Sequence, residues 1–216
     1  MVLERYRTGA GRVFTPFALA LGRLGLTQNG ISVVSLLFAL VAGGVFYLAT
    51  PQDAWLLLVA AAFVSLNGLF DAFDGALARS QNAQSKQGDY LDHVIDRYAD
   101  VAILTGVALG GVADVRLGLL ALVGVFLTSY MGTQAQALGL GRMYGGLLGR
   151  ADRMVLLIGA PVVEYALLAL AVPLPVVGGI AFGALNVTLL YFAVVGNVTA
   201  LQRFASGWQA LARAGP

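Results

Sequence analysis

The sequence predicts an all-α integral membrane protein with about six transmembrane helices and an N-terminal amphipathic helix in the membrane interface. Two observations support this fold class. First, 59% of the 216 residues are hydrophobic and 11% are charged, whereas about a quarter of the residues in a soluble domain are charged. Second, apolar runs recur at lengths near the roughly 20 residues that a helix needs to cross a bilayer. One membrane domain is expected over residues 1–216, because no internal repeat or second domain is visible.

The first segment, residues 1–26, is expected to form a juxtamembrane helix. Basic residues such as Arg5 and Arg12 are interspersed with aromatic residues such as Phe14 and Phe17. A helix with this mixture lies in the plane of the interface with its apolar side buried. The segment also lacks the discrete apolar core and the cleavage site of a signal peptide.

The transmembrane bundle is expected over residues 31–203. Its six apolar runs cover residues 31–49, 54–78, 90–111, 117–138, 154–171 and 176–201. Six spans place the two ends of the bundle on the same side of the membrane. A polar residue before the first run, Thr27 or Asn29, is expected to cap its helix.

The basic residues orient the bundle. Of the 13 Lys and Arg residues, only Arg116 lies in a turn on the far side from the ends of the bundle. The other 12 are Arg5, Arg7, Arg12, Arg23, Arg79, Lys86, Arg97, Arg142, Arg150, Arg153, Arg203 and Arg213. Because cytoplasmic loops of membrane proteins carry an excess of basic residues, this side and both termini are expected to be cytoplasmic, with the protein in the cell membrane.

Four aspartates give the chain its most informative chemistry. Asp71 and Asp74 are three residues apart, and Asp92 and Asp96 are four apart, so each pair lies on one face of a helix. Unpaired carboxylates near the edge of a hydrocarbon layer are costly, and a cation between the helices would remove that cost. Hard oxygen ligands suit Mg²⁺ or Mn²⁺, and two such ions would lie about 3.5 to 4 Å apart.

The residues around these aspartates follow a fixed pattern, Asp71-x2-Asp74-Gly75-x2-Ala78-Arg79-x8-Gly88-x3-Asp92-x3-Asp96. At every fixed position this pattern resembles the signature of the CDP-alcohol phosphotransferase family of integral membrane enzymes. The resemblance implies a phospholipid-biosynthesis reaction in which a phosphoalcohol group moves from a CDP-activated lipid to a hydroxyl acceptor and CMP is released. It also implies a homodimer that works on membrane lipid, with no nucleic-acid partner.

The resemblance assigns roles to the aspartates. Asp71, Asp74, Asp92 and Asp96 are the expected metal ligands, and Asp96 is also the expected catalytic general base. A carboxylate beside a metal is a weak base, but the acceptor hydroxyl becomes more acidic under the influence of the same charge.

A second group of residues is expected to contact the CDP moiety: Asn29, Gly75, Ala78, Arg79 and Gly88. A glycine lets the nucleotide approach the backbone closely, and Arg79 can bond phosphate oxygens with two nitrogen atoms. In the family, a proline usually precedes the asparagine, and Gln28 replaces it here.

The acceptor pocket is expected to contain Arg150, Arg153, Arg203 and Asp100. The arginines are similar in position to those of archaeal and actinobacterial members that use inositol phosphate. Inositol 1-phosphate is therefore the first choice of acceptor, and CDP-archaeol or CDP-diacylglycerol is the expected donor. One departure keeps glycerol phosphate, serine and a neutral polyol open: Gly132 and Gln134 follow Ser129-Tyr130 where those members often carry two basic residues.

Two other functions stay open at this point. A UbiA-like prenyltransferase also binds Mg²⁺-pyrophosphate through aspartates on membrane helices, but its first cluster spaces them by four, and here Asp71 and Asp74 are three apart. A divalent-cation transporter would place its site near the midplane, often between internal repeats. Asn67 either faces the site or bonds a neighbouring helix. The intramembrane acid Glu164 is expected to bond a neighbouring helix and has no assigned role.

Overall fold

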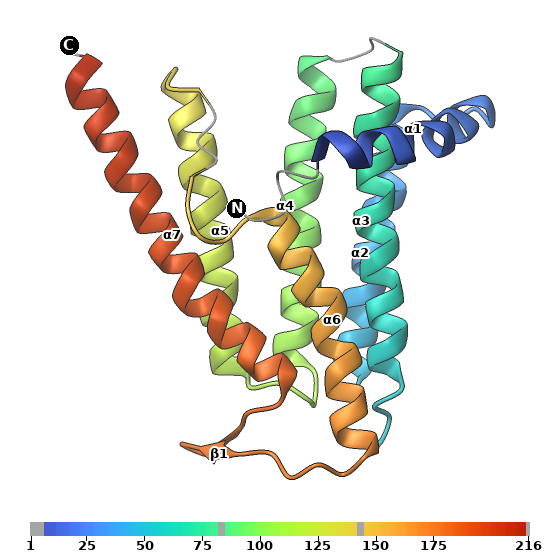
Figure 1. The fold of residues 1–216 in the computed structure, drawn as a ribbon, viewed down its shortest axis with the longest axis vertical. Helices are drawn as coiled ribbons and strands as arrows, with labels where there is room; N and C mark the ends of the chain where they lie inside the picture. Colours follow the sequence, from blue (N-terminus) through green and yellow to red (C-terminus); the bar gives the residue numbers. More distant parts are fainter. Residues whose placement is uncertain (1–6, 82–84, 142–144, 215–216) are drawn as a thin grey trace.

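The computed structural model of the chain describes residues 7–81, 85–141 and 145–214. This part of the chain is almost entirely helical. Its elements are α1 (Arg7–Arg23), α2 (Gln28–Leu48), α3 (Leu56–Ser80), α4 (Lys86–Leu109), α5 (Val115–Ala137), α6 (Arg150–Ala169), β1 (Val176–Val177), β2 (Ile180–Ala181) and α7 (Ala184–Ala214). Figure 1 shows α2 to α7 running roughly along the long axis of the molecule and α1 lying across them. The predicted all-α class is confirmed.

Four of the described helices, α2, α3, α5 and α7, are long and apolar enough to cross a membrane. The other two long helices carry too many charged residues to qualify by composition. In α4 these are mainly acids of its first half, and in α6 they include Arg150, Arg153 and Glu164. The membrane assignment therefore agrees with the sequence, and the count of six spans stays a prediction.

Helix α1 packs across the C-terminal half of α3, as an interfacial helix would. Phe14 and Phe17 of α1 contact Phe73 of α3, with ring centroids 5.8 and 6.1 Å apart, and Ala18 is fully buried in the same contact. Residues 1–6 of the expected juxtamembrane segment, and Arg142 among the orienting residues, lie outside the described part of the chain.

The start of α2 is capped by Thr27, whose Oγ1 accepts a hydrogen bond of 3.1 Å from the Gly30 N–H. Ser85 caps α4 in the same way, accepting 3.0 Å from the Gly88 N–H. Each cap satisfies one of the free N–H groups of a helix start. Both helices thus begin at the end of the bundle where the aspartates lie.

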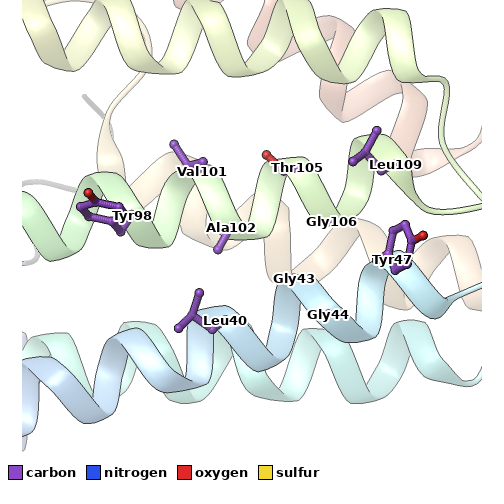
Figure 2. Close-up of a pocket in the computed structure, with 10 residues that line it drawn as sticks. All are labelled: Leu40, Gly43, Gly44, Tyr47, Tyr98, Val101, Ala102, Thr105, Gly106 and Leu109. Atoms are coloured by element: carbon purple, nitrogen blue, oxygen red, sulfur yellow. The ribbon is translucent and has the colours of Figure 1, made fainter.

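Small residues bring α2 and α4 into close contact. A Cβ atom on Gly106 of α4 would collide with the Gly43 carbonyl of α2, and one on Gly110 would collide with the Phe46 carbonyl. The four-residue spacing of Gly106 and Gly110 therefore serves packing inside the chain. Beside this contact lies a groove of about 360 Å³ (Figure 2), lined by Leu40, Gly43, Gly44, Tyr47, Tyr98, Val101, Ala102, Thr105, Gly106 and Leu109. Of the described residues that line it, none is a predicted site residue.

The expected start of the sixth span at residue 176 is wrong. Residues 176–181 form a small antiparallel hairpin whose turn residues Gly178 and Gly179 have φ values of 60° and 79°. Two consecutive positive φ values are the conformation that a tight two-residue hairpin turn requires and that glycine adopts readily. Helix α7 begins only at Ala184 and continues to Ala214, past the expected bundle limit at residue 203.

The arrangement places the acidic residues at one end of the bundle. In Figure 1 the C-terminal end of α3, the start of α4 and the end of α7 lie at the top, and the hairpin lies at the bottom. Helix α6 begins part-way down the bundle, so that its first turn lies beside the middle of its neighbours. The first residues of α6 therefore meet side chains of α3 and α4 that are buried below the upper end.

Candidate active site

Three of the predicted metal ligands converge. Asp71 and Asp74 of α3 and Asp92 of α4 each offer a carboxylate oxygen, and these oxygens all lie within 4.8 Å of one another. The helical spacing of three residues sets the first two on one face, and the packing of α3 and α4 beside α2 brings the third to them. This is an arrangement of hard oxygen ligands on separate rigid elements, which suits Mg²⁺ or Mn²⁺.

The fourth predicted ligand, Asp96, lies one turn deeper on α4 and is 5% exposed. Its Oδ1 is 2.5 Å from Nη2 of Arg150, and its Oδ2 is 3.7 Å from Nη2 of Arg97. Within the described part of the chain, Oδ1 is buried and its contact with Arg150 is an ion pair rather than a hydrogen bond. Arg150 is therefore the cation that compensates this buried oxygen in the absence of a metal ion.

Helix α2 supports the aspartates of α3. The Ser32 hydroxyl donates a 2.6 Å hydrogen bond to Oδ2 of Asp74. One turn away, the Asn67 amide donates to the Ser35 carbonyl and hydroxyl at 3.0 and 2.9 Å, and the Ser35 hydroxyl donates back to the Asn67 carbonyl. These bonds fix the rotation of α3 and thereby aim Asp74 at the site. Asn67 therefore bonds a neighbouring helix, one of the two roles expected for it.

The arginines of α6 are tied to carboxylates. Nη2 of Arg150 is 2.7 Å from Oδ1 of Asp71 as well as in contact with Asp96. Nη1 of Arg153 is 3.1 Å from Oδ2 of Asp100. The same oxygen is 3.2 Å from Nη2 of Arg97. The predicted acceptor residues Arg150, Arg153 and Asp100 are thus brought together, and they adjoin the metal ligands directly.

The eight residues joined by these contacts are called here the acidic cluster: Asp71, Asp74, Asp92, Asp96, Asp100, Arg97, Arg150 and Arg153. Five carboxylates face three guanidinium groups, which leaves a formal charge of −2 among these described residues. Burial makes uncompensated charge costly. The donor set and its charge therefore fit divalent cations, with Asp71, Asp74 and Asp92 as the residues best placed to hold them.

Arg203, the third arginine of the expected acceptor pocket, has different partners. Its Nε donates to the Gly145 carbonyl at 2.8 Å and its Nη1 to the Thr128 carbonyl at 2.7 Å. It lines a cavity of about 420 Å³ whose other described lining residues are Gly145, Gly146, Gln202 and Ser206. These two bonds tie Arg203 to α5 and to the segment that precedes α6, and its role in the acceptor pocket stays a prediction.

The residues expected to contact the CDP moiety surround the start of α2 and the end of α3. Asn29 is exposed in the first turn of α2. A Cβ on Gly88 would lie 3.1 Å from the Gln28 amide nitrogen, so α4 approaches the start of α2 closely there. A Cβ on Gly75 would lie 3.1 Å from the guanidinium of Arg79.

The remaining two members of this group differ in exposure. Ala78 is 4% exposed, whereas Arg79 is exposed one residue later on α3. The small alanine therefore packs within the bundle, and the long arginine is accessible at its rim. This placement is compatible with an arginine that reaches the phosphates of a nucleotide.

Sequence reasoning missed two residues of this site. Ser32 supports Asp74, and Arg97 joins Asp96 to Asp100. A signal for Ser32 was present, because Ser32 and Ser35 are polar residues spaced by three in an apolar run and therefore share a helix face. Arg97 directly follows Asp96, and its role could not be assigned without knowing which way its side chain turns.

The comparison with known proteins identifies the family. A profile of the CDP-alcohol phosphatidyltransferase family matches residues 26–142, which include all four aspartates of the motif. The chain belongs to this family. It is a membrane transferase, as the sequence predicted, and the prenyltransferase and cation-transporter alternatives are not supported.

Relatives and solved structures narrow the resemblance. The archaetidylinositol phosphate synthase of Pyrococcus horikoshii is 33% identical over 156 residues, which are 72% of this chain and 80% of the relative. A crystal structure of Mycobacterium tuberculosis phosphatidylinositol phosphate synthase with CDP-DAG bound matches with a TM-score of 0.72 and 27% identity, covering 91% of this chain and 94% of that one. The same synthase with manganese and citrate gives a TM-score of 0.71 and 26% identity, covering 90% and 88%.

Proposed function

We propose that this transferase moves a phosphatidyl or archaetidyl group from a CDP-lipid to a hydroxyl of inositol 1-phosphate and releases CMP. The observation that carries the proposal is the convergence of Asp71, Asp74 and Asp92 within 4.8 Å, inside a motif whose spacing matches the family signature. The similar proteins named above are an archaetidylinositol phosphate synthase and a phosphatidylinositol phosphate synthase. Their names support both the proposed reaction and the proposed class of acceptor.

The donor half of the proposed site is formed by α3, α4 and the start of α2. Bound divalent ions, Mg²⁺ or Mn²⁺, would neutralise the donor pyrophosphate and the charge that develops on the departing CMP. Two such ions added to the charge of −2 on the acidic cluster would balance a doubly negative pyrophosphate. Asp71, Asp74, Asp92 and Asp96 are the proposed ligands.

The nucleotide contacts are proposed at the rim of the site. Asn29, Gly75, Ala78, Arg79 and Gly88 are the residues assigned to the CDP moiety. Gly75 and Gly88 leave the backbone open to close approach, and the exposed Arg79 can bond phosphate oxygens with two nitrogen atoms.

Asp96 is the proposed general base. Its buried Oδ1 pairs with Arg150 at the first turn of α6, and once that contact is released the oxygen can accept the proton of the acceptor hydroxyl. In that step the acceptor oxygen forms a bond to the lipid-bearing phosphorus, the bond from that phosphorus to the bridging oxygen breaks, and the electron pair leaves with CMP. Asp96 lies between the metal ligands and the first turn of α6, where donor and acceptor would meet.

The acceptor half is proposed at the first turn of α6. Arg150 and Arg153 supply two guanidinium groups beside Asp96, which favours an anionic acceptor such as inositol 1-phosphate over serine or a neutral polyol. Asp100 holds Arg153 and can also accept hydrogen bonds from inositol hydroxyls. Arg203, which lines a cavity with Gln202 and Ser206, is kept as the third proposed acceptor-binding arginine.

The membrane placement follows from the charge distribution. The end of α3 and the start of α4, which carry the motif, lie at the same end of the bundle as the C-terminal end of α7 in Figure 1. The positive-inside bias places that end on the cytoplasmic side, where CDP-lipid headgroups and soluble acceptors are accessible. A homodimer remains a prediction from the family resemblance.

Release of CMP by the purified protein tests the proposed function. The assay combines Mg²⁺ or Mn²⁺, CDP-archaeol or CDP-diacylglycerol, and one acceptor at a time: inositol 1-phosphate, glycerol phosphate, serine, myo-inositol or none. We expect CMP with inositol 1-phosphate and a lipid product that retains its phosphate. Turnover with a different acceptor alone would correct the acceptor, and no CMP with any acceptor would contradict the reaction.

A further inference from the structure

We propose that Arg150 is an exchangeable counter-cation of the acidic cluster. It neutralises Asp71 and Asp96 until divalent ions bind, and it then turns to the phosphate group of the acceptor. This inference rests on the proposed function. It adds a binding order, in which the divalent ions bind first and the acceptor phosphate then gains Arg150 as a ligand.

One nitrogen atom of Arg150 bridges the two helices that carry the motif. Its Nη2 is 2.7 Å from Oδ1 of Asp71 on α3 and 2.5 Å from Oδ1 of Asp96 on α4. Asp71 and Asp96 are also proposed metal ligands, so ions held between α3 and α4 would draw on the same two carboxylates. A guanidinium and a divalent ion repel each other at such distances, so both cannot be bound there at full strength.

The two contacts of Arg150 differ in quality. The contact with Asp71 is a hydrogen bond, whereas Oδ1 of Asp96 accepts no hydrogen bond within the described residues. The ion pair with Asp96 therefore supplies charge without satisfying the oxygen. A divalent ion can replace this contact because it supplies the positive charge that the buried carboxylate would otherwise lose.

The position of Arg150 allows it to move, in contrast to that of Arg153. Arg150 is the first residue of α6, directly after Gly149, and its side chain is 36% exposed. Arg153 lies one turn later with its side chain 7% exposed and paired with Asp100. A long, half-exposed side chain at a helix start can swing toward solvent, whereas a buried one is held by its neighbours.

The alternative position of Arg150 remains next to the acceptor site. Residues three apart on a helix are neighbours, so a released Arg150 stays beside Arg153. Two adjacent guanidinium groups form a site for a phosphate dianion. By thermodynamic linkage, ions should then raise phosphate affinity, and phosphate should raise ion affinity by the same factor.

Binding of Mn²⁺ to the purified full-length protein, without substrate, tests the exchange. Removal of a competing cation should tighten Mn²⁺ binding, so we expect Arg150→Gln to bind Mn²⁺ about tenfold more tightly than the wild type, equivalent to about 1.4 kcal/mol. The matched control is Arg153→Gln, the same substitution one turn later, which should change Mn²⁺ affinity by less than about twofold because Arg153 pairs with Asp100 alone among the described carboxylates. Paramagnetic resonance or calorimetry measures both affinities.

A second measurement uses inorganic phosphate as the probe. The wild type should bind phosphate at least about fivefold more tightly with Mn²⁺ than without it, and Arg150→Gln should lose most of this coupling. Equal coupling in both proteins would overturn the proposal, since the phosphate would then be held by the ion alone. The coupling in the wild type also tests the exchange if Arg150→Gln fails to fold, because its absence contradicts the proposed order.

The outcomes separate this inference from the proposed function. If the wild type binds Mn²⁺ and releases CMP while Arg150→Gln binds Mn²⁺ equally or less tightly, the exchange is wrong and the reaction stands. If the wild type neither binds Mn²⁺ nor releases CMP with any acceptor, the proposed function itself is contradicted.

Discussion

The buried and half-buried acids at the two ends of the bundle are balanced in different ways. At the end that carries the motif, five carboxylates of the acidic cluster face three guanidinium groups. At the opposite end, Glu164 is 3% exposed and its Oε2 accepts a 2.9 Å hydrogen bond from the Leu185 N–H at the start of α7. The positive end of a helix dipole therefore compensates Glu164 locally.

Asp114 lies at the same end as Glu164, and its charge is also compensated by nearby donors. It caps α5 by accepting the Arg116 N–H at 2.9 Å, and the Arg116 guanidinium donates to both of its carboxylate oxygens. These hydrogen bonds hold the pKa of Asp114 below its usual value. The Asp114 N–H in turn donates to the Asn186 side chain at 2.7 Å, which joins α5 to α7.

The difference separates structural acids from functional ones. An acid whose charge is met by nearby backbone and side-chain donors stabilises the fold and needs nothing further. A group of acids that outnumbers its cationic partners needs positive charge from outside the chain. The largest expected effects of mutation on activity therefore lie at the motif end, and those on stability alone lie at the other.

Neutralising a motif aspartate should have the largest effect. We expect Asp92→Asn and Asp96→Asn each to lower CMP release by about 10²-fold or more, because each removes a metal ligand or the base. The thermal unfolding temperature should not fall, since one member of an excess of like charges is lost. Asp89→Asn is the control on the same helix, with its side chain 61% exposed, and should retain activity. Near-normal turnover in Asp96→Asn would end its assignment as base.

Metal ions should stabilise the motif end specifically. At a concentration 100 times its dissociation constant, Mn²⁺ should add about 2.7 kcal/mol to the free energy of unfolding, and chelation should reverse this gain together with CMP release. Thermal unfolding at increasing Mn²⁺ measures the effect. Asp92→Asn should lose it and Glu164→Gln should keep it. An equal response in both variants would show that the ions bind elsewhere.

Changes at Glu164 should affect stability and leave catalysis alone. Glu164→Ala leaves the Leu185 N–H without its partner and should lower the free energy of unfolding by about 1 to 3 kcal/mol. Glu164→Gln keeps an acceptor oxygen and loses only the interaction with the helix dipole, so about 0.3 to 1 kcal/mol is expected. CMP release per folded molecule should match the wild type in both. A selective loss of turnover would place Glu164 in the reaction after all.

Much of the fold could be predicted because its signals are local. The apolar runs predicted the helices, and of the two expected caps of α2, Thr27 and Asn29, the structure shows Thr27. The prediction failed at residue 176, where an apolar run continued across a hairpin. Hydrophobicity cannot distinguish a membrane helix from an apolar turn, but the two adjacent glycines at residues 178 and 179 are a turn signal that could have been used.

The acceptor site could not be predicted in detail for the opposite reason. The sequence predicted that Arg150, Arg153 and Arg203 lie on the cytoplasmic side. That prediction gives their depth in the membrane and says nothing about which residues they contact. Their partners depend on where α6 begins relative to α3 and α4 and on the return of the chain between α5 and α6. In that geometry Arg150 forms ion pairs with Asp71 and Asp96, and Arg203 donates hydrogen bonds to two backbone carbonyls.

The sequence by itself determined the helical membrane class, the family motif and the residues able to bind divalent ions, because these depend on composition and on spacing along single helices. Only the tertiary structure decided which charges compensate one another. It shows that Asp71, Asp74 and Asp92 converge, that Arg150 bridges two of the motif aspartates, and that Glu164 caps a helix. Ion pairing and hydrogen bonding act over a few ångströms, so they are set by the packing of helices that are distant in the chain.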